Sequence, residues 1–301
     1  MKRITVAGLV ALAVTMATNT RAQDYTFRVL INKGKNEMKT RSGWQQVKVG
    51  SSLQTSDEVK IVENAYLGLV HTSGKALEVK ESGRYTVTEL AARVSGGTSV
   101  VNKYTDFILS ANTEAKNKLA ATGAVSRGTD NIKVYLPRPD NSVVYNDRVR
   151  IAWEPEGPQK SYEVIFKSMF GDELAVLETT GNFVSIDLGD RSFENEDNII
   201  VTVAEKGTAG KSSEEYTLKK LSRADKDRIR AAYSEIAEST GEESAINKLL
   251  IAGFYEENNL LIDAIGAYQE AIQLAPDVPS YEEAYNDFLL RNGLKKLPTK
   301  K

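Results

Sequence analysis

Side chains that could perform catalysis are scarce in this sequence. His71 is the single histidine among 301 residues, and cysteine is absent. A Ser-His-Asp arrangement would have to use His71, but residues 67–71 form a strand pattern and no Gly-x-Ser-x-Gly turn presents a serine. Zinc sites draw mainly on histidine and cysteine. The sequence therefore predicts no catalytic residue, no cofactor and no zinc site.

One acidic loop carries the oxygen ligands that calcium prefers. Its five carboxylates belong to Asp187, Asp190, Glu194, Glu196 and Asp197. The ordered Asp-x-Asp-x-Asp-Gly spacing of a calcium loop is absent, so a solvated loop is the favoured interpretation and no metal ligand is assigned. Calcium binding by residues 187–197 stays open. Paired carboxylates of a glycosidase could lie anywhere among the 41 acidic residues, which keeps a hydrolase as an alternative.

The candidate functional residues are therefore ones that could bind a partner. Asn247, Lys248 and Glu256 are predicted on the concave face of a helix pair, where a peptide or a helix could dock. Trp44 follows the turn at Ser42 and Gly43, where a strand begins. Trp44 is expected in the core, with an exposed side chain that binds glycan as the alternative.

The three helix residues lie in the segment 245–276, which has two apolar-periodic halves broken at Asn258 and Asn259. This segment is similar to a tetratricopeptide repeat. The small and aromatic positions of that repeat are matched by Ala252, Tyr255, Ala264, Tyr268 and Ala271, with Pro276 closing it. Lys248 stands where the repeat usually has an early aromatic residue. The resemblance implies two antiparallel helices that cross closely at small residues.

Four helices are predicted in residues 222–301. Their ranges are 223–238, 241–256, 260–274 and 281–292. Three capping boxes, which begin at Ser222, Thr240 and Ser280, predict helix starts. A repeat array needs about three repeats for independent stability, so we expect the flanking helices to cap the single repeat into a tetratricopeptide-like helical unit. A generic helical bundle is the alternative.

Residues 23–95 have the pattern of short strands separated by turns. The order Trp44, Val47, Val49, Gly50 and Leu53, followed by the alternating segments 65–69 and 74–79, resembles the β domain of FecR-type proteins. Those proteins are envelope signal transducers with a membrane segment and a cytoplasmic anti-sigma region. Neither is recognisable here, so the resemblance implies a small β-barrel or sandwich module without the signalling role.

Residues 131–221 show about seven further short strands, the number expected of an immunoglobulin-like sandwich. The spacing of Val149, Ile151 and Trp153, followed by Tyr162 and Val164, resembles that of fibronectin type III domains, which implies a buried tryptophan facing a tyrosine. Ile199 stands near the position where that class often has a corner tyrosine. Residues 96–130 are predicted as a helix from about residue 98 to 119 and a linker, with a glycine hinge before the helix.

Residues 1–22 have the pattern of a secretory signal peptide. Lys2 and Arg3 precede an apolar run that is shorter than the roughly 20 residues of a membrane span. A small-x-small site ends at Ala22, so Gln23 is expected to begin the mature chain, with an uncleaved anchor as the alternative. No transmembrane segment is expected in the mature chain. The absence of cysteine excludes lipid attachment and fits a periplasmic protein, with a secreted or cell-surface protein as second choice.

The net charge of −2 gives no reason to expect nucleic acid, which calls for a strongly basic face. The sequence thus predicts a multi-domain β-plus-α chain. Its modules indicate a non-enzymatic exported scaffold or adaptor of the bacterial cell envelope, which binds protein partners through its helical unit and its sandwich. Binding of glycan or peptidoglycan, or sensing in the envelope, is the alternative function.

Overall fold

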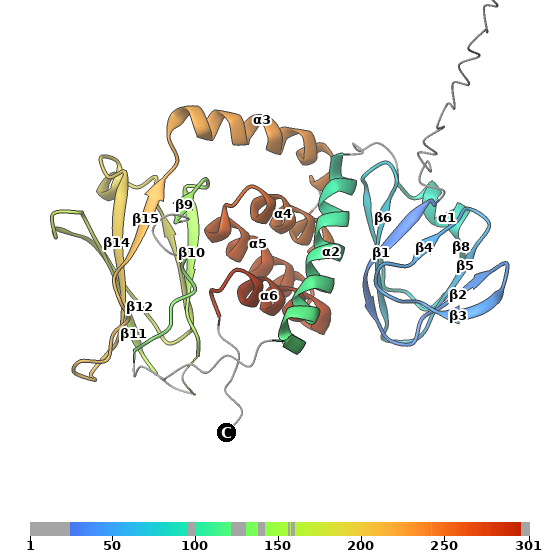
Figure 1. The fold of residues 1–301 in the computed structure, drawn as a ribbon, viewed down its shortest axis with the longest axis horizontal. Coiled ribbons are helices and arrows are strands. Elements are labelled where there is room, and N and C mark those ends of the chain that lie inside the picture. The colour runs from blue at the N-terminus through green and yellow to red at the C-terminus, as the bar shows by residue number, and fades with distance from the viewer. Residues whose placement is uncertain are drawn as a thin grey trace, which may run out of the picture.

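A computed structural model describes residues 25–94, 100–121, 131–137, 142–155, 157, 160–241 and 243–295. The predicted signal peptide, the glycine hinge and most of the predicted linker lie outside these residues. The described residues form several β-sheets and a group of helices, which confirms the predicted β-plus-α class (Figure 1). None of their helices has the length and apolar character needed to cross a membrane.

The N-terminal module consists of two four-stranded sheets. The first, in the order β4-β1-β6-β7, contains β1 (Phe27–Lys33), β4 (Ser52–Leu53), β6 (Tyr66–His71) and β7 (Ala76–Val79). The second, in the order β3-β2-β5-β8, contains β2 (Glu37–Thr40), β3 (Gly43–Gln46), β5 (Glu58–Ile61) and β8 (Gly83–Thr86). Alternate apolar residues of both sheets, such as Phe27, Val59 and Leu69, form a core of their own.

A short helix, α1 (Val87–Ala92), follows these strands, in the segment 23–95 where the sequence pattern predicted only strands and turns. The Thr86 hydroxyl accepts a hydrogen bond from the Glu89 amide at 3.1 Å, and the Glu89 carboxylate accepts one from the Thr86 amide at 2.8 Å. This capping box satisfies two amides at the helix start. The strand interpretation was wrong because Val87 continues the apolar alternation of β8 and is itself buried.

The described part of residues 131–221 has seven strands in two sheets that share a core. The five-stranded sheet contains, in spatial order, β12 (Glu173–Thr179), β11 (Tyr162–Lys167), β14 (Asn198–Glu205), β15 (Tyr216–Lys220) and β9 (Val143–Val144). The other sheet pairs β10 (Arg148–Ala152) with β13 (Phe183–Asp187). Trp153 is fully buried and its ring meets that of Tyr162 at 5.2 Å, as expected. Val134 makes an isolated bridge to Trp153.

Five long helices complete the part of the fold that the structure describes. They are α2 (Val100–Ala121), α3 (Arg223–Thr240), α4 (Ala245–Glu257), α5 (Leu261–Leu274) and α6 (Pro279–Arg291). The four predicted C-terminal helices are therefore present. Of the three predicted capping boxes, only the one at Ser222 begins a helix. The Ser222 hydroxyl accepts a hydrogen bond from the Asp225 amide.

The other two predicted helix starts were wrong. Thr240 ends α3, where its hydroxyl donates to the Ile236 carbonyl, and Ser244 caps α4 instead. Ser280 lies inside α6, whose first residue is Pro279. Proline suits the first helical turn because its missing N–H has no partner there in any case. A Ser/Thr-x-x-Glu spacing therefore does not identify a helix start by itself. Here Ser244 caps α4 and Pro279 begins α6, each close to the predicted cap.

The helices lie between the two β modules rather than at one end of the molecule (Figure 1). Helix α5 packs against β10 of the sandwich, and α6 packs against β1 of the N-terminal module. Helix α2, from the segment between the β modules, packs on α4 and α6. One continuous apolar cluster includes Tyr66 of the N-terminal sheet, Phe254 of α4 and Ala152 of the sandwich. The helical unit therefore joins the modules as a middle layer.

Candidate functional site

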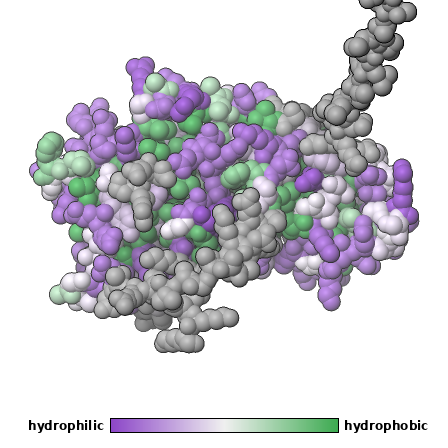
Figure 2. Space-filling view, in the orientation of Figure 1, coloured by the Kyte–Doolittle hydropathy of each residue, from purple (hydrophilic) through white to green (hydrophobic). Residues whose placement is uncertain are grey.

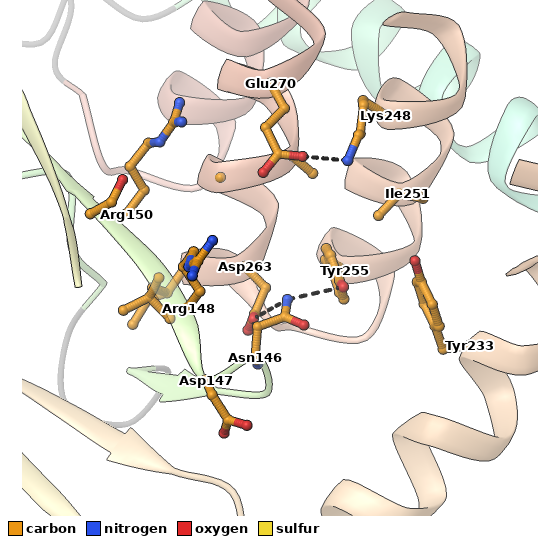
Figure 3. A pocket seen from close by; sticks show the side chains of 15 residues that line it. Asn146, Asp147, Arg148, Arg150, Tyr233, Lys248, Ile251, Tyr255, Asp263 and Glu270 are labelled. Carbon is orange, nitrogen blue, oxygen red and sulfur yellow. Dashed lines mark hydrogen bonds and ion pairs between the residues drawn. The ribbon is translucent and has the colours of Figure 1, made fainter. Parts of the chain in front are cut away.

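A groove lies where α3, α4 and α5 face strand β10. Its larger part is a cavity of about 340 Å³, and a second cavity of about 260 Å³ continues it along α3 and the start of α4. Tyr233, Lys248 and Ile251 line both cavities, so the two form one surface, which we call the α3–β10 groove (Figure 3). On the face shown in Figure 2, hydrophilic side chains prevail and hydrophobic residues show only in small groups between them.

The periodicity of each element brings its polar side chains into the groove. On β10, Val149 and Ile151 are buried in the sandwich core, so strand alternation directs Arg148 and Arg150 to the other face, which α5 covers. On α4, Lys248, Ile251 and Tyr255 recur at intervals of three and four residues and share one helix face. Figure 3 shows these side chains converging from the sandwich and from the helices.

Helix α5 supplies the remaining face of the groove with the same spacing. Asp263, Gly266 and Glu270 lie three and four residues apart. Tyr233 closes the opposite side from α3, and its ring lies nearly parallel to that of Tyr255, with 6.1 Å between their centroids. The groove thus combines an aromatic wall with charged groups at its rim.

Most of the carboxylates at the groove already have partners. Glu270 pairs with Lys248 at 2.6 Å, and Asp147 pairs with Lys226 at 2.7 Å. The guanidinium of Arg148 lies 3.9 Å from the Asp187 carboxylate, a long contact on an exposed side chain. At the sandwich end of the groove, the positive charge of Arg148 is therefore only weakly balanced by a carboxylate.

Asp263 fixes the start of β10 to α5. Its carboxylate accepts hydrogen bonds from the amides of Tyr145 at 2.9 Å and Asn146 at 2.8 Å, and from the Asn146 side chain at 2.8 Å. The same Asn146 side chain donates to the Tyr255 hydroxyl at 3.0 Å. Asp263 is only 5 % exposed. Its first role is therefore structural, since it orders the turn that places Arg148.

Burial raises the pKa of Asp263 to about 6, against the effect of its three donors. Because this folded-state pKa lies above the ordinary value of 3.8, the folded chain binds more protons than the unfolded chain between these two pH values. The stability contributed by Asp263 is therefore greatest below the ordinary pKa and is lost as the pH rises towards 6.

We expect Asp263→Asn to remove this pH dependence, which amounts to a change on the order of 3 kcal/mol for a shift of two units. Urea unfolding of both chains at intervals from pH 4 to pH 7 measures it. Other carboxylates contribute equally to both chains, so the difference between the chains isolates Asp263. Asp190→Asn, in an exposed loop, is the matched control. A difference that stays constant over this range would show that Asp263 does not titrate there.

Gly266 lines the groove without adding a side chain to it. It lies inside α5, where glycine costs roughly 0.5–1 kcal/mol relative to alanine. A Cβ added at Gly266 would meet nothing within 4 Å, so no close packing requires glycine there. By contrast, a Cβ at Gly253 would lie 2.8 Å from the Ile108 side chain, where α2 packs on α4. Gly253 serves packing, whereas Gly266 preserves space at the surface of the groove.

The structure separates the three helix residues predicted to bind a partner. Lys248 lines the α3–β10 groove. Asn247 is 5 % exposed and Glu256 is 9 % exposed, so both are buried and Lys248 is the one of the three that lines the groove. Glu256 is covered because Arg291 and Asn292, from the end of α6, bind its carboxylate. The sequence pattern could not show that α6 folds back over the end of α4.

Trp44 is exposed, which corrects the expectation of a core position. It is 39 % exposed, on the edge strand β3, where all four residues are exposed. The charged groups of Lys39 and Arg84 lie over its ring at 5.9 Å and 5.4 Å from the centroid. In Figure 1, β3 lies on the side of the N-terminal module that faces away from the helices, so Trp44 is remote from the groove.

His71 and the acidic loop form no recognisable site. His71 ends β6, as the pattern predicted, and its Nδ1 lies 2.9 Å from the Ser73 hydroxyl. Burial lowers the pKa of His71. In the described part of the chain, which includes all of 187–197, no group of three His, Cys, Asp or Glu residues is placed to hold a metal ion.

The sequence reasoning missed Arg148, Arg150, Tyr233, Asp263 and Gly266. Two signals were available. The charged residues of β10 alternate with buried apolar ones, but the second face of such a strand ordinarily meets solvent. A glycine inside an otherwise regular helix also indicates a packing or functional role. Neither signal shows which elements meet, because α5 follows β10 by more than a hundred residues.

Comparison with known proteins identifies no family. No family model matches the chain, and no curated protein matches it. A crystal structure of the Arg-specific cysteine proteinase gingipain R aligns with 30 % of this chain and 18 % of its own, at 15 % identity and a TM-score of 0.21. A β-1,2-glucanase from Parabacteroides distasonis aligns with 82 % of this chain and 38 % of its own, at 10 % identity and a TM-score of 0.24. Likenesses this low carry no argument about function.

Proposed function

We propose that this chain is a non-enzymatic, exported scaffold of the bacterial cell envelope that holds an extended segment of a partner protein in the α3–β10 groove. A FecR-like module and an immunoglobulin-like sandwich of the fibronectin type III kind would flank the tetratricopeptide-like helices. The signal-peptide pattern of residues 1–22 supports export to the periplasm. The position of the helices as a middle layer supports a scaffold, since they would hold both β modules in fixed orientation.

The observation that carries this proposal is Gly266. Its absent side chain leaves room along the α5 side of the groove at a cost to the stability of α5. The groove extends along α3 past Lys248, which suits an elongated occupant better than a compact metabolite. Helix grooves commonly bind peptide segments in this manner.

A graded series at Gly266 tests the proposal. Gly266→Ala should raise the free energy of unfolding by about 0.5–1 kcal/mol and keep partner capture, because one methyl group leaves most of the groove open. Gly266→Leu should fold equally well and lose capture by filling the groove. The measurement is in-cell crosslinking of the tagged full-length chain, with mass spectrometry of the captured proteins. Discrete partners that persist undiminished in Gly266→Leu would contradict a site in this groove.

Binding of glycan or peptidoglycan is the second candidate function, and the exposure of Trp44 favours it. An exposed indole on an edge strand, with two cationic groups beside it, is a surface on which a sugar ring could stack. The same crosslinking experiment separates the two functions. Trp44→Ala should keep the protein partners of the groove. If Trp44→Ala instead loses binding to purified cell-wall fragments while Gly266→Leu retains it, glycan binding is the better account.

A further inference from the structure

Arg150 has hydrogen-bonding capacity that the fold does not use. Its Nη2 donates to the Gln273 side chain at a long 3.3 Å, and its guanidinium lies over the Phe183 ring at 4.7 Å. Its Nη1 is buried and has no hydrogen-bond partner among the described residues. Guanidinium groups bind carboxylates through two parallel N–H donors, and a buried donor without a partner is costly. Arg150, which lines the groove, is therefore short of one acceptor.

The charges around Arg150 leave no carboxylate of the groove to fill that role. Glu270 is held by Lys248, Asp147 by Lys226, and Asp263 by its three donors. Arg148 projects from the same face of β10 into the same cavity, so two cationic groups stand at one end of the groove (Figure 3). The apolar and aromatic side chains of Ile251 and Tyr255 line the same cavity from α4, across from the two arginines (Figure 3).

We infer that the sandwich end of the α3–β10 groove binds a carboxylate of the partner segment, held by Arg150 and Arg148. This inference rests on the proposed function and specifies the chemistry of its ligand. A singly charged carboxylate fits better than a phosphate, because Glu270 and Asp147 also line the cavity and would repel a second negative charge. Because Ile251 and Tyr255 line the cavity across from the arginines, the partner segment should also carry an apolar or aromatic residue near the carboxylate.

The carboxylate has two sources in a peptide, the chain terminus and an acidic side chain. An array of random-sequence hexapeptides distinguishes them when each peptide is made in three matched forms. One form has a free C-terminal acid, one has a C-terminal amide and an internal glutamate, and one has an amide and no acidic residue. The purified full chain, fluorescently labelled, is the probe applied to the array. We expect binding to one or both carboxylate forms, at least about tenfold stronger than to the uncharged form.

Variants assign the binding to named residues. Arg150→Gln should reduce carboxylate-dependent binding about tenfold or more, and Arg150→Lys should restore it only in part, because lysine lacks the two-pronged donor geometry. Arg230→Gln, an exposed arginine of α3 paired with Asp227, should change nothing and is the matched control. Thermal unfolding of each variant checks that it is folded.

The outcomes separate this inference from the function on which it rests. Carboxylate-dependent binding that is lost in Arg150→Gln supports it. Peptides that bind equally in all three forms, and that Gly266→Leu abolishes, would overturn the carboxylate site and leave the peptide groove standing. If no peptide binds in a manner sensitive to Gly266→Leu, the inference is overturned, and in-cell crosslinking then decides the proposed function separately.

Discussion

Replacing Arg291 with alanine is expected to lower the free energy of unfolding by about 3–5 kcal/mol, the cost of leaving a buried charge without its partner. Arg291 at the end of α6 binds Glu256 of α4 through two hydrogen bonds, with Nε donating to Oε1 at 2.6 Å. The side chain of Arg291 is 9 % exposed and that of Glu256 is 5 % exposed, so both are almost fully buried. Tyr268 and Asn292 also donate to the Glu256 carboxylate, at 3.2 Å and 2.8 Å.

Equilibrium urea unfolding measures this loss, and two further variants define its cause. Arg230→Ala removes an exposed ion pair with Asp227 and should change stability by less than about 1 kcal/mol. The double variant Glu256→Gln with Arg291→Met removes both charges and should recover a large part of the loss, because no uncompensated charge remains buried. A loss in Arg291→Ala no greater than that in Arg230→Ala would show that Glu256 finds water or another donor.

The Glu256–Arg291 pair also illustrates what the sequence could and could not predict. Helical periodicity identified α4, α5 and α6, and the single repeat-like spacing correctly anticipated that Tyr255 and Tyr268 are buried. The same periodicity placed Glu256 on the concave face of the helix pair, whereas Glu256 is buried. Periodicity gives the angular position of a residue on its own helix, but it does not show whether a later helix covers that position.

In the N-terminal module, the periodicity of the sequence likewise predicted the elements but not what covers them. Alternation correctly predicted most strands, because one face of each sheet is buried and the register must match that face. It misplaced Trp44, since β3 pairs on one side only and both its faces meet solvent. The candidate groove was beyond such reasoning, because it forms between β10 and helices that follow it by many residues. Of the predicted partner-binding residues, Lys248 alone lines the groove.

The second large effect is expected where the N-terminal module contacts the helices. We call this contact, formed by Tyr66 and Glu78 with Tyr281 and Ile246, the joint. Tyr281 of α6 is fully buried, and its hydroxyl lies 2.6 Å from that of Tyr66 on β6. Their rings meet edge to face, with 6.0 Å between centroids. Glu78 of β7 strengthens the same joint by accepting a hydrogen bond from the Ile246 amide at 3.1 Å, at the start of α4.

Tyr281→Ala is expected to lower the free energy of unfolding by about 3–5 kcal/mol, since it removes a buried aromatic ring and leaves a cavity. Tyr281→Phe should cost only about 1 kcal/mol, because Tyr66 can still donate to Glu78, with which it also interacts. Tyr85→Phe, which loses an exposed hydrogen bond to the Glu81 carbonyl, is the matched control and should lie within about 0.5 kcal/mol of the parent chain.

Amide hydrogen exchange shows where the loss in Tyr281→Ala falls. If the N-terminal module is held by this joint, the amides of β6 should lose protection more than those of β14, which lies in the sandwich on the other side of the helices. The sandwich would then keep its contact with α5, and with it the α3–β10 groove. Equal loss of protection in β6 and β14 would show instead that the whole chain unfolds as one cooperative unit. In that case the N-terminal module stabilises the groove directly, and peptide capture should weaken in Tyr281→Ala as well.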